Sequence, residues 1–451
     1  MNPNHGNPAR TEREIKLIEK LRSRPDLWER FEAVLALTEA EGGELRTADE
    51  VEALLVEEVR RLGSEAMHDW AARAEERTAR EFQSANPRAT VRKKKALSWW
   101  CVFGEVRVEE RLWRDPQRSY LRPFPARVQV SARGKSRRLQ RVLTDFGAEH
   151  SFAAGCARLR EHYGFSLNAS ALRTVTLRHA ERAARTLAAR AQESFRILPA
   201  EGAGAVVAEA DGTMICTVEP GRARAGTRPR QWKEMRLLAA QAQGSARASY
   251  AATFGSVAEA GRRWGHCTRE AGWGLRSRIH VVADGAEWIS LQSREVFGAQ
   301  AVVLTDFYHV SEYIAAAGQV CRPQAPRRWL HTQQKRLRRG AIEPVLAELE
   351  AQLEPDTVPD EAAPVRAARR YLGNRRDALD YAGAIARELP IGSGLIESGH
   401  KHVLHARLKG AGTAWLPAHA DALAQLRVLR VNQHWDAFWP ATQPIPAMHH
   451  N

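Results

Sequence analysis

The sequence predicts an α/β protein in which a mixed β-sheet forms the core, a helical and β-hairpin region precedes it, and a helical insertion interrupts it. Strand-like runs gather between residues 205 and 306. Helical periodicity dominates residues 11–80, 137–195 and 306–388. A chain of 451 residues exceeds what one hydrophobic core usually holds. Several domains are therefore expected.

One stretch organises the rest of the chain. Residues 205–218 read AVVAEADGTMICTV, which is typical of a half-buried strand with Asp211 in its middle. Burying an unpaired carboxylate costs several kcal/mol, so such a group is usually paired or bound to a cation. An Asp-Gly hairpin turn is the alternative for this segment. The pattern recurs, however, in VVADGAEWI at residues 281–289, and a third strand-like run at 302–305 leads into Asp306.

Charge predicts a polyanionic partner. The formal net charge is +15, the pI is about 10.0, and only ten of the 68 basic residues are Lys. A guanidinium group can donate two hydrogen bonds to the oxygens of one phosphate, so nucleic acid is the first candidate partner. The alternative is a basic protein from a genome that favours Arg. No run of 18 apolar residues and no disulfide or zinc spacing among the five Cys is present, which predicts a cytoplasmic protein without a membrane partner.

The N-terminal part is expected to form three regions. Residues 1–87 are a helical region broken near residues 41–43, and a solvated helical pair or an oligomerisation arm would explain it. Residues 88–136 are a basic arm and a β-hairpin that turns near Gly104. The arm would lie along DNA phosphates or act only as a linker; its basic residues are Lys93, Lys94 and Lys95.

Residues 137–197 return to helical periodicity. One helix is expected from Ser151 to Tyr163, ends at Gly164, and is followed by another that begins near Asn168. Two helices joined by a short glycine-containing turn fit a helix-turn-helix, in which Arg173 and Arg178 would contact DNA. Any helical hairpin gives a similar pattern.

The core, residues 205–306, has a recognisable order of elements. Three strands are followed by a helix, a fourth strand, another helix and a fifth strand, which is the order of a ribonuclease-H-like mixed sheet. In that sheet the first and fourth strands are parallel neighbours, so Asp211 and Asp284 would approach each other and demand a divalent cation. The five strands are expected at residues 206–218, 232–241, 248–254, 279–283 and 302–305.

The C-terminal part completes the core. Residues 307–388 are an Arg-rich helical insertion in which Arg336 and Arg339 suit a DNA backbone. Residues 389–440 return to the core, and Glu397 falls in the first turn of a helix, either as a capping acid or as a third ligand for the Asp pair. The histidines near it lack zinc spacing and are expected on a helix face. Residues 412–439 are expected to form one closing helix, and residues 441–451 are a tail.

With these residues in view, the chain resembles the DDE transposases of bacterial insertion sequences, specifically the Kra-type group related to Mutator-like elements. The resemblance spans residues 211–415, about half of the chain. Its order and spacing are more specific than any single motif. The matching pieces are ADGTMI, WKEMR, DGAEWI, DFYH, IGSGLIESGHK and ARLKGAGTAW.

The resemblance implies that Asp211, Asp284 and Glu397 hold two divalent cations, Mg²⁺ or Mn²⁺, in a ribonuclease-H-like domain. Asp306 and His309 look like a supporting Asp-x-x-His pair; Asp306 stays open as the second acid, although Asp284 is preferred because the fourth strand adjoins the first. Double-stranded DNA, as element ends and target, and a dimer on DNA are the implied partners. Further phosphate contacts would come from Lys401, Arg407 and Lys409.

Two other functions remain open from the sequence. One is a ribonuclease-H-like DNA nuclease or junction resolvase that cuts but never joins. The other is a non-catalytic, domesticated DNA-binding protein whose acids are structural.

Overall fold

The computed structural model describes residues 8–39, 47–117, 119–192, 195, 197–219 and 229–439. The chain divides into two compact units, one of residues up to Thr176 and one of Leu177–Phe438. Within the described ranges no helix is both long and apolar enough to cross a membrane. The break expected at residues 41–43 and the tail expected at 441–451 lie outside the described residues.

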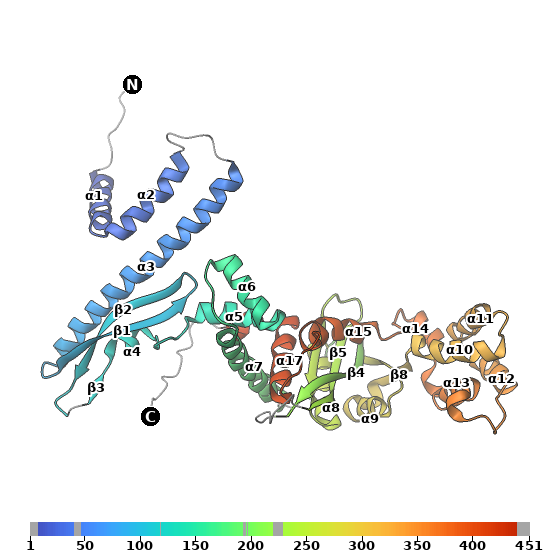
Figure 1. The fold of residues 1–451 in the computed structure, drawn as a ribbon. Coiled ribbons are helices and arrows are strands. Elements are labelled where there is room, and N and C mark those ends of the chain that lie inside the picture. Colours follow the sequence, from blue (N-terminus) through green and yellow to red (C-terminus); the bar gives the residue numbers. More distant parts are fainter. Residues whose placement is uncertain are drawn as a thin grey trace. The chain divides into compact units, whose positions relative to one another are not determined.

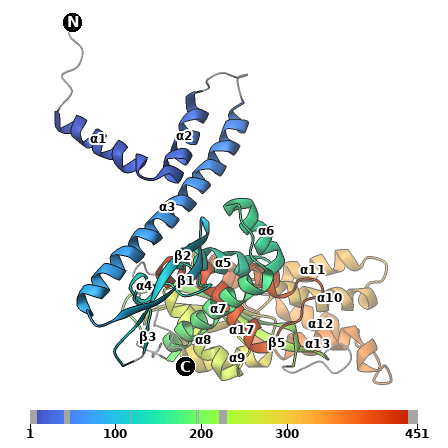
Figure 2. The ribbon, with the colours of Figure 1, turned by 60° about the vertical axis from the view of Figure 1, so that its left-hand side comes forward.

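The first unit begins with helices, as predicted, but with three instead of two. They are α1 (Pro8–Arg22), α2 (Pro25–Glu39) and α3 (Ala48–Ala85). α3 starts at a capping box in which the Thr47 side chain accepts from the Glu50 amide and the Glu50 carboxylate accepts from the Thr47 amide. α2 runs beside the N-terminal part of α3 (Figure 1, Figure 2) and buries none of its residues.

A β-hairpin follows, as predicted, and Gly104 turns it with a φ of 115°. The expected basic arm is wrong in one respect, because Lys93, Lys94 and Lys95 lie inside the first strand, paired with Leu112, Arg111 and Glu110. These lysines are exposed, so the strand keeps them in water while its second half packs on α3. The elements are β1 (Thr90–Cys101), β2 (Gly104–Arg114), β3 (Tyr120–Leu121) and α4 (Pro123–Val128).

Two helices joined by a short turn follow, as predicted. The Ser151 side chain caps the first of them, and Gly164, with a φ of 73°, ends it. The Asn168 side chain then accepts a hydrogen bond from the Ala171 amide at 2.7 Å and starts the next helix. Whether they bind DNA stays a prediction. The helices of this region are α5 (Arg137–Glu149), α6 (Phe152–Tyr163) and α7 (Ala169–Gln192).

The second unit is built on a five-stranded mixed sheet in the order β6-β5-β4-β7-β8. β4, β5 and β6 form an antiparallel meander, and β4 pairs with β7 in parallel from Ala205↔Arg278 to Glu209↔Val282. The parallel pairing of the first and fourth strands is therefore confirmed. The strands are β4 (Ala205–Val218), β5 (Arg230–Ala242), β6 (Ala248–Thr253), β7 (Arg278–Ala283) and β8 (Ala301–Thr305).

One face of this sheet packs on α8 (Val257–Glu270) and α9 (Glu287–Phe297), as Figure 1 shows. The even-numbered residues of the first half of β4, among them Val206 and Ala208, join this core around the fully buried Trp264. The odd-numbered residues of β4 point to the opposite face, because side chains alternate along a strand. That opposite face carries Asp211.

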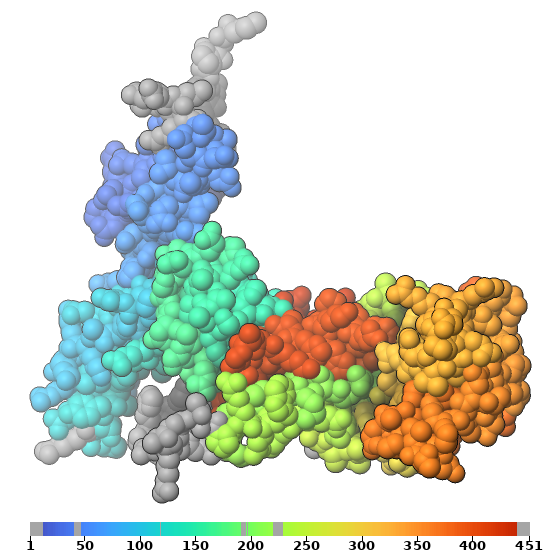
Figure 3. All heavy atoms as spheres, turned by 45° about the vertical axis from the view of Figure 1, so that its right-hand side comes forward, coloured from blue at the N-terminus to red at the C-terminus, as the bar shows by residue number. Residues whose placement is uncertain are grey.

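The helical insertion forms a compact mass beside the sheet (Figure 3) and has its own apolar core. Its core is continuous with the sheet through Val207 and Leu304. Its buried side chains include Ile314, Trp329 and Val365. The insertion contains α10 (Phe307–Cys321), α11 (Pro326–Arg338), α12 (Ile342–Glu350), α13 (Pro364–Gly373) and α14 (Tyr381–Ala386).

The C-terminal elements return to the sheet. The single closing helix expected over residues 412–439 is wrong: α17 ends at Val431, and a separate short helix follows. Asn432 and Gln433 form a turn between the two helices, and the φ of Gln433 is 63°. The elements are α15 (Gly394–Gly399), the π-helical turn η4 (His400–His405), α16 (Ala406–Leu408), α17 (Pro417–Val431) and α18 (Trp435–Phe438).

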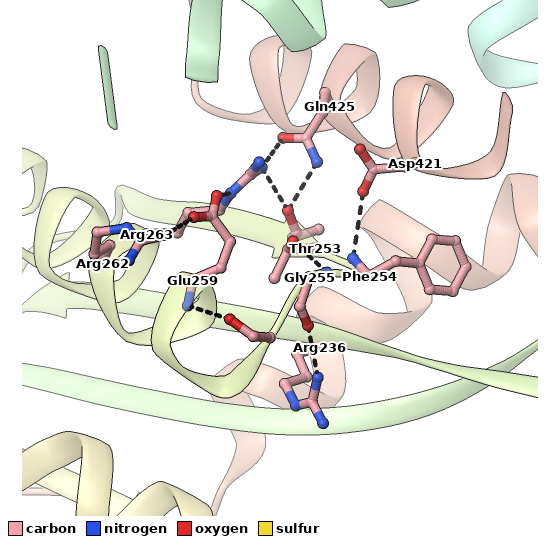
Figure 4. Close-up of polar contacts among 11 residues, drawn as sticks. Arg236, Thr253, Phe254, Gly255, Glu259, Arg262, Arg263, Asp421 and Gln425 are labelled. Carbon is pink, nitrogen blue, oxygen red and sulfur yellow. Dashed lines mark hydrogen bonds and ion pairs between the residues drawn. The ribbon is translucent and has the colours of Figure 1, made fainter. Parts of the chain in front are cut away.

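Side chains of α8 and α17 close the outer edge of the sheet at β6 (Figure 4). Gln425 Nε2 donates to the Ala252 carbonyl at 2.8 Å, and Arg263 Nη1 donates to the same carbonyl at 2.9 Å. Asp421 Oδ1 accepts from the Phe254 amide at 3.3 Å. An exposed strand edge is a template for pairing with another chain, and these contacts occupy it.

Candidate active site

The acid-bearing face of β4 is covered by α15 and the π-helical turn that follows it. Glu209, Asp211 and Thr213 share this face because they are spaced by two residues. Each of them meets a different residue of the covering helix: Glu209 contacts the Ile396 amide, Asp211 lies against His400, and Thr213 contacts His405. Successive residues on this face of β4 therefore contact successive positions along the covering helix.

Asp211 lies at the edge of this covered face. Its side chain is 43% exposed, and its Oδ1 accepts a hydrogen bond from the Gly212 amide at 2.7 Å. Its Oδ2 lies 3.1 Å from His400 Nε2, although the angle is not that of a hydrogen bond. The carboxylate is therefore held on one side and open to solvent on the other.

The π-helical turn His400–His405 explains how two histidines reach β4. Residues five apart align in a π-helix, and the rings of His400 and His405 stack at 5.3 Å with an interplanar angle of 24°. His405 Nε2 lies 3.1 Å from Thr213 Oγ1. Burial, with the nearby Lys409 and His400 charges, lowers the pKa of His405 to about 4, so this ring is neutral at pH 7. These histidines face the sheet, whereas a helix-face position was expected.

Asp284 directly follows β7, in a turn held by the insertion. Its Oδ1 accepts from the Ala286 amide at 2.9 Å, and the Tyr371 hydroxyl donates to its carbonyl. Arg375 Nη2 donates to the Gly285 carbonyl at 2.8 Å. Gly285 has a φ of 92°, and a Cβ there would meet the Arg375 side chain at 2.3 Å. Only glycine suits this turn, so α13 fixes the backbone that presents Asp284.

Asp306 supports the site through backbone contacts. It is 3% exposed, and its Oδ1 accepts from the amides of Tyr308 and His309 at 2.6 and 2.8 Å, which caps α10. Its Oδ2 accepts from the Ser393 amide at 2.5 Å, just before α15. Both oxygens hold backbone in place, which favours Asp284 over Asp306 as the second acid.

His309 lies in the first turn of α10 and is half-buried. Its Nδ1 is 3.4 Å from Glu312 Oε2, and its ring packs against Tyr313 and Tyr371 with centroid distances of 5.7 and 5.9 Å. The two tyrosine rings stack on each other at 4.0 Å. His309 therefore belongs to an aromatic cluster beside the Asp284 turn.

Glu397 is exposed on α15, and Glu209 is buried beneath the start of the same helix. Glu209 is 1% exposed, and its Oε2 accepts from the Ile396 amide at 2.7 Å. Burial, with smaller contributions from the charges of Asp306 and Glu397, raises the pKa of Glu209 to about 8, although the hydrogen bond from Ile396 opposes this. The sequence reasoning missed Glu209, and it treated His400 only as one of several histidines expected on a helix face. The two-residue spacing of Glu209 from Asp211 was the available signal for Glu209, whereas the contact of His400 with Asp211 had no local signal.

The donor chemistry of the three acids fits a hard divalent cation, because all of them offer carboxylate oxygens. Among the described residues, however, no three His, Cys, Asp or Glu side chains are gathered closely enough to hold a metal ion. The strands and the helix that carry the acids meet, while the side chains themselves are not drawn together. Holding a cation therefore requires rotation of exposed side chains such as those of Asp211 and Glu397.

The basic residues expected to bind DNA differ in their surroundings. Arg336 is engaged by Glu348, with Nη1 and Oε2 2.5 Å apart. Arg407 is 5% exposed, and its guanidinium lies 4.8 Å from the Trp415 ring centroid. The expectation that Arg407 binds phosphate is therefore withdrawn. The exposed members of the set are Lys93, Lys94, Lys95, Arg173, Arg178, Arg339, Lys401 and Lys409.

A cavity of about 370 Å³ lies elsewhere in the second unit, between α7, α8, β6 and α17. Several of its polar wall residues are already paired, since Glu270 binds Ser249 and His434, and Arg263 binds Gln425. The acids are not among its lining residues.

Comparison with known proteins adds no family to this picture. No family model matches the chain, and no curated protein is significantly similar to it. The resemblance to DDE transposases rests on the motifs themselves and stays a prediction.

Proposed function

We propose that the protein is a DNA transposase that cleaves and joins DNA at a site formed by Asp211, Asp284 and Glu397. The single observation that carries the proposal is the parallel pairing of β4 with β7. Its last pair is Glu209↔Val282, and Asp211 and Asp284 each follow two residues later, so both acids lie just beyond the same end of the parallel pairing. The strand order also suits a ribonuclease-H-like core.

Two divalent cations, Mg²⁺ or Mn²⁺, would be held by these three carboxylates. When bound, they supply charge neutralisation at the scissile phosphate and an activated water or DNA 3′-hydroxyl. Other residues of the chain fix the backbone that carries these acids. Tyr371 and Arg375 fix the turn of Asp284, and Asp306 fixes the loop before α15. Second-layer contacts of this kind orient ligand side chains.

Exposed basic residues would bind the DNA backbone. Lys401 is exposed within the π-helical turn that follows the Glu397 helix, and Lys409 is exposed directly after α16. Each cation that neutralises a phosphate releases counterions, so affinity should fall as the salt concentration rises. Double-stranded DNA is the substrate class that the charge of +15 favours.

A strand-transfer assay tests the proposal. Purified protein, Mg²⁺ and oligonucleotides bearing pre-cleaved element ends are mixed with a supercoiled target plasmid. The element ends are taken from the DNA that flanks the reading frame. Joined products are expected, and they should disappear with Asp211→Asn. Cleavage without joining would instead indicate a nuclease or resolvase. DNA binding without any Mg²⁺-dependent nicking would indicate a non-catalytic DNA-binding protein.

A further inference from the structure

The N-terminus of α15 is capped from a distant strand. Ser393 occupies the N-cap position, but its side chain makes no capping hydrogen bond. An N-cap side chain normally accepts from the second or third helical amide. Here the third amide, that of Ile396, donates to Glu209 Oε2 at 2.7 Å, across 187 residues of sequence. Glu209 therefore caps this helix in place of a local side chain.

Two further contacts fix the same helix to the sheet. The Ser393 amide donates to Asp306 Oδ2, which ties the start of α15 to the end of β8. Gly399 ends α15 against the sheet, where a Cβ would meet Tyr250 at 2.6 Å and Leu237 at 3.0 Å. α15 is thus held at its start, in its first turn and at its end. The middle contact is the one nearest to Glu397.

Glu209 connects the position of Asp211 with that of Glu397. It lies two residues before Asp211 on the same face of β4, and the amide that it binds belongs to the residue directly before Glu397. A change in this one contact would shift Glu397 relative to Asp211. Its other oxygen, Oε1, accepts no hydrogen bond from the described residues.

We propose that Glu209 is a positioning residue, which holds the first turn of α15 on β4 and thereby sets the place of Glu397 relative to Asp211. The role rests on the proposed function for its importance to catalysis, whereas the contact itself belongs to the fold. The contact needs an acceptor oxygen at the length of a Glu side chain. Gln preserves that acceptor, Asp is too short to reach the Ile396 amide, and Leu removes it.

The experiment compares Glu209→Gln, Glu209→Asp and Glu209→Leu with the unmodified full chain. Hydrogen–deuterium exchange is followed in peptides covering residues 391–400, and DNA cleavage is measured at several Mn²⁺ concentrations. We expect Glu209→Gln to match the unmodified chain. Glu209→Asp and Glu209→Leu should exchange about tenfold faster in α15, lower kcat about 10- to 100-fold, raise the Mn²⁺ midpoint, and change KM for DNA less than twofold.

Asp421→Leu is the matched control, because Asp421 also accepts a backbone amide, that of Phe254, but at the β6 edge. It should lower the unfolding temperature without changing exchange in α15, kcat or the Mn²⁺ midpoint. Wild-type exchange in α15 of Glu209→Asp, or of Glu209→Leu where it folds, overturns the positioning role whether or not the chain cuts DNA. Faster exchange in these variants, in a chain that never cuts DNA, keeps the contact and rejects the proposed function instead.

Discussion

The β6 edge and the acid-bearing end of the sheet treat their polar groups differently. At β6, alternate residues turn their backbone groups outward, and side chains from α8 and α17 bond them. At the acid end, Glu209 Oε1 and His400 Nδ1 find no hydrogen-bond partner among the described residues, and Asp211 is 43% exposed. Buried polar groups that only build structure are almost always paired. Unpaired buried atoms also occur elsewhere, such as Arg236 Nε beside β6, so the exposed Asp211 carboxylate is the feature that favours the acid end as a functional site.

The largest expected effect comes from removing an acid. Asp211→Asn, Asp284→Asn and Glu397→Gln should each lower strand cleavage on the order of a thousandfold or more, because each removes a ligand charge. Binding of element ends, measured by gel shift, should stay within about twofold. Cleavage at the wild-type rate by any one of the three would remove that residue from the site.

Asp306→Asn should cause a partial loss. An amide oxygen can still cap α10, but the amide nitrogen cannot accept from the Ser393 amide, so one of the two ties is lost. Cleavage rates measured beside Asp284→Asn separate the two candidates for the second acid. A complete loss for Asp306→Asn together with an active Asp284→Asn would reverse the assignment.

His400→Ala tests the residue that lies against Asp211. Without the imidazole, the Asp211 carboxylate loses its neighbour at 3.1 Å, and kcat should fall about 10- to 100-fold. His402→Ala is a matched control, since His402 is exposed on the same turn. Equal kcat values for the two variants would show that contact with Asp211 has no part in the reaction.

Asn432→Leu tests the closed edge. Its side-chain Oδ1 accepts from the Tyr250 amide, and its Nδ2 donates to the Tyr250 carbonyl at 2.9 Å. Removing these buried contacts leaves both backbone groups unpaired and should cost about 2 kcal/mol of unfolding free energy. Denaturant unfolding measures the loss, and the cleavage rate of the remaining folded protein should be unchanged. A drop in kcat would mean that the two ends of the sheet are coupled.

The smallest expected effect concerns pH. Burial lowers the pKa of His280, which contacts the Pro390 carbonyl at 2.8 Å through Nε2. A depressed pKa in the folded state means full stability above the unfolded pKa of 6.5, with stability lost as the pH falls through the folded pKa. The unfolding free energy should drop by at most about 1.4 kcal/mol per pH unit as the pH falls from 6.5 towards the folded pKa. His280→Gln should flatten this dependence, and an unchanged slope would assign it to another group.

The strand order was predictable because local patterns determine it. The run of small and β-branched residues around Asp211 predicts a strand. The helix over residues 257–270 separates the meander from β7, so the parallel pair followed from connection rules. The prediction of a basic arm was wrong at Lys93, Lys94 and Lys95. A run of basic residues lacks the apolar alternation that identifies a strand, even when a strand contains it. The contacts of Glu209 and His400 were not predicted, because their partners, Ile396 and Asp211, lie about 190 residues away in the sequence.

That long separation has a consequence for synthesis. Ile396 reaches Glu209 only after the whole insertion has been made. At about 5–20 residues per second, the ribosome needs roughly ten seconds or more to add the intervening chain. Until then, the emerging polypeptide carries Asp211 and Asp284 without their third acid. Under the proposed function, a prematurely terminated product would lack the third acid, and only finished molecules would be able to cut DNA.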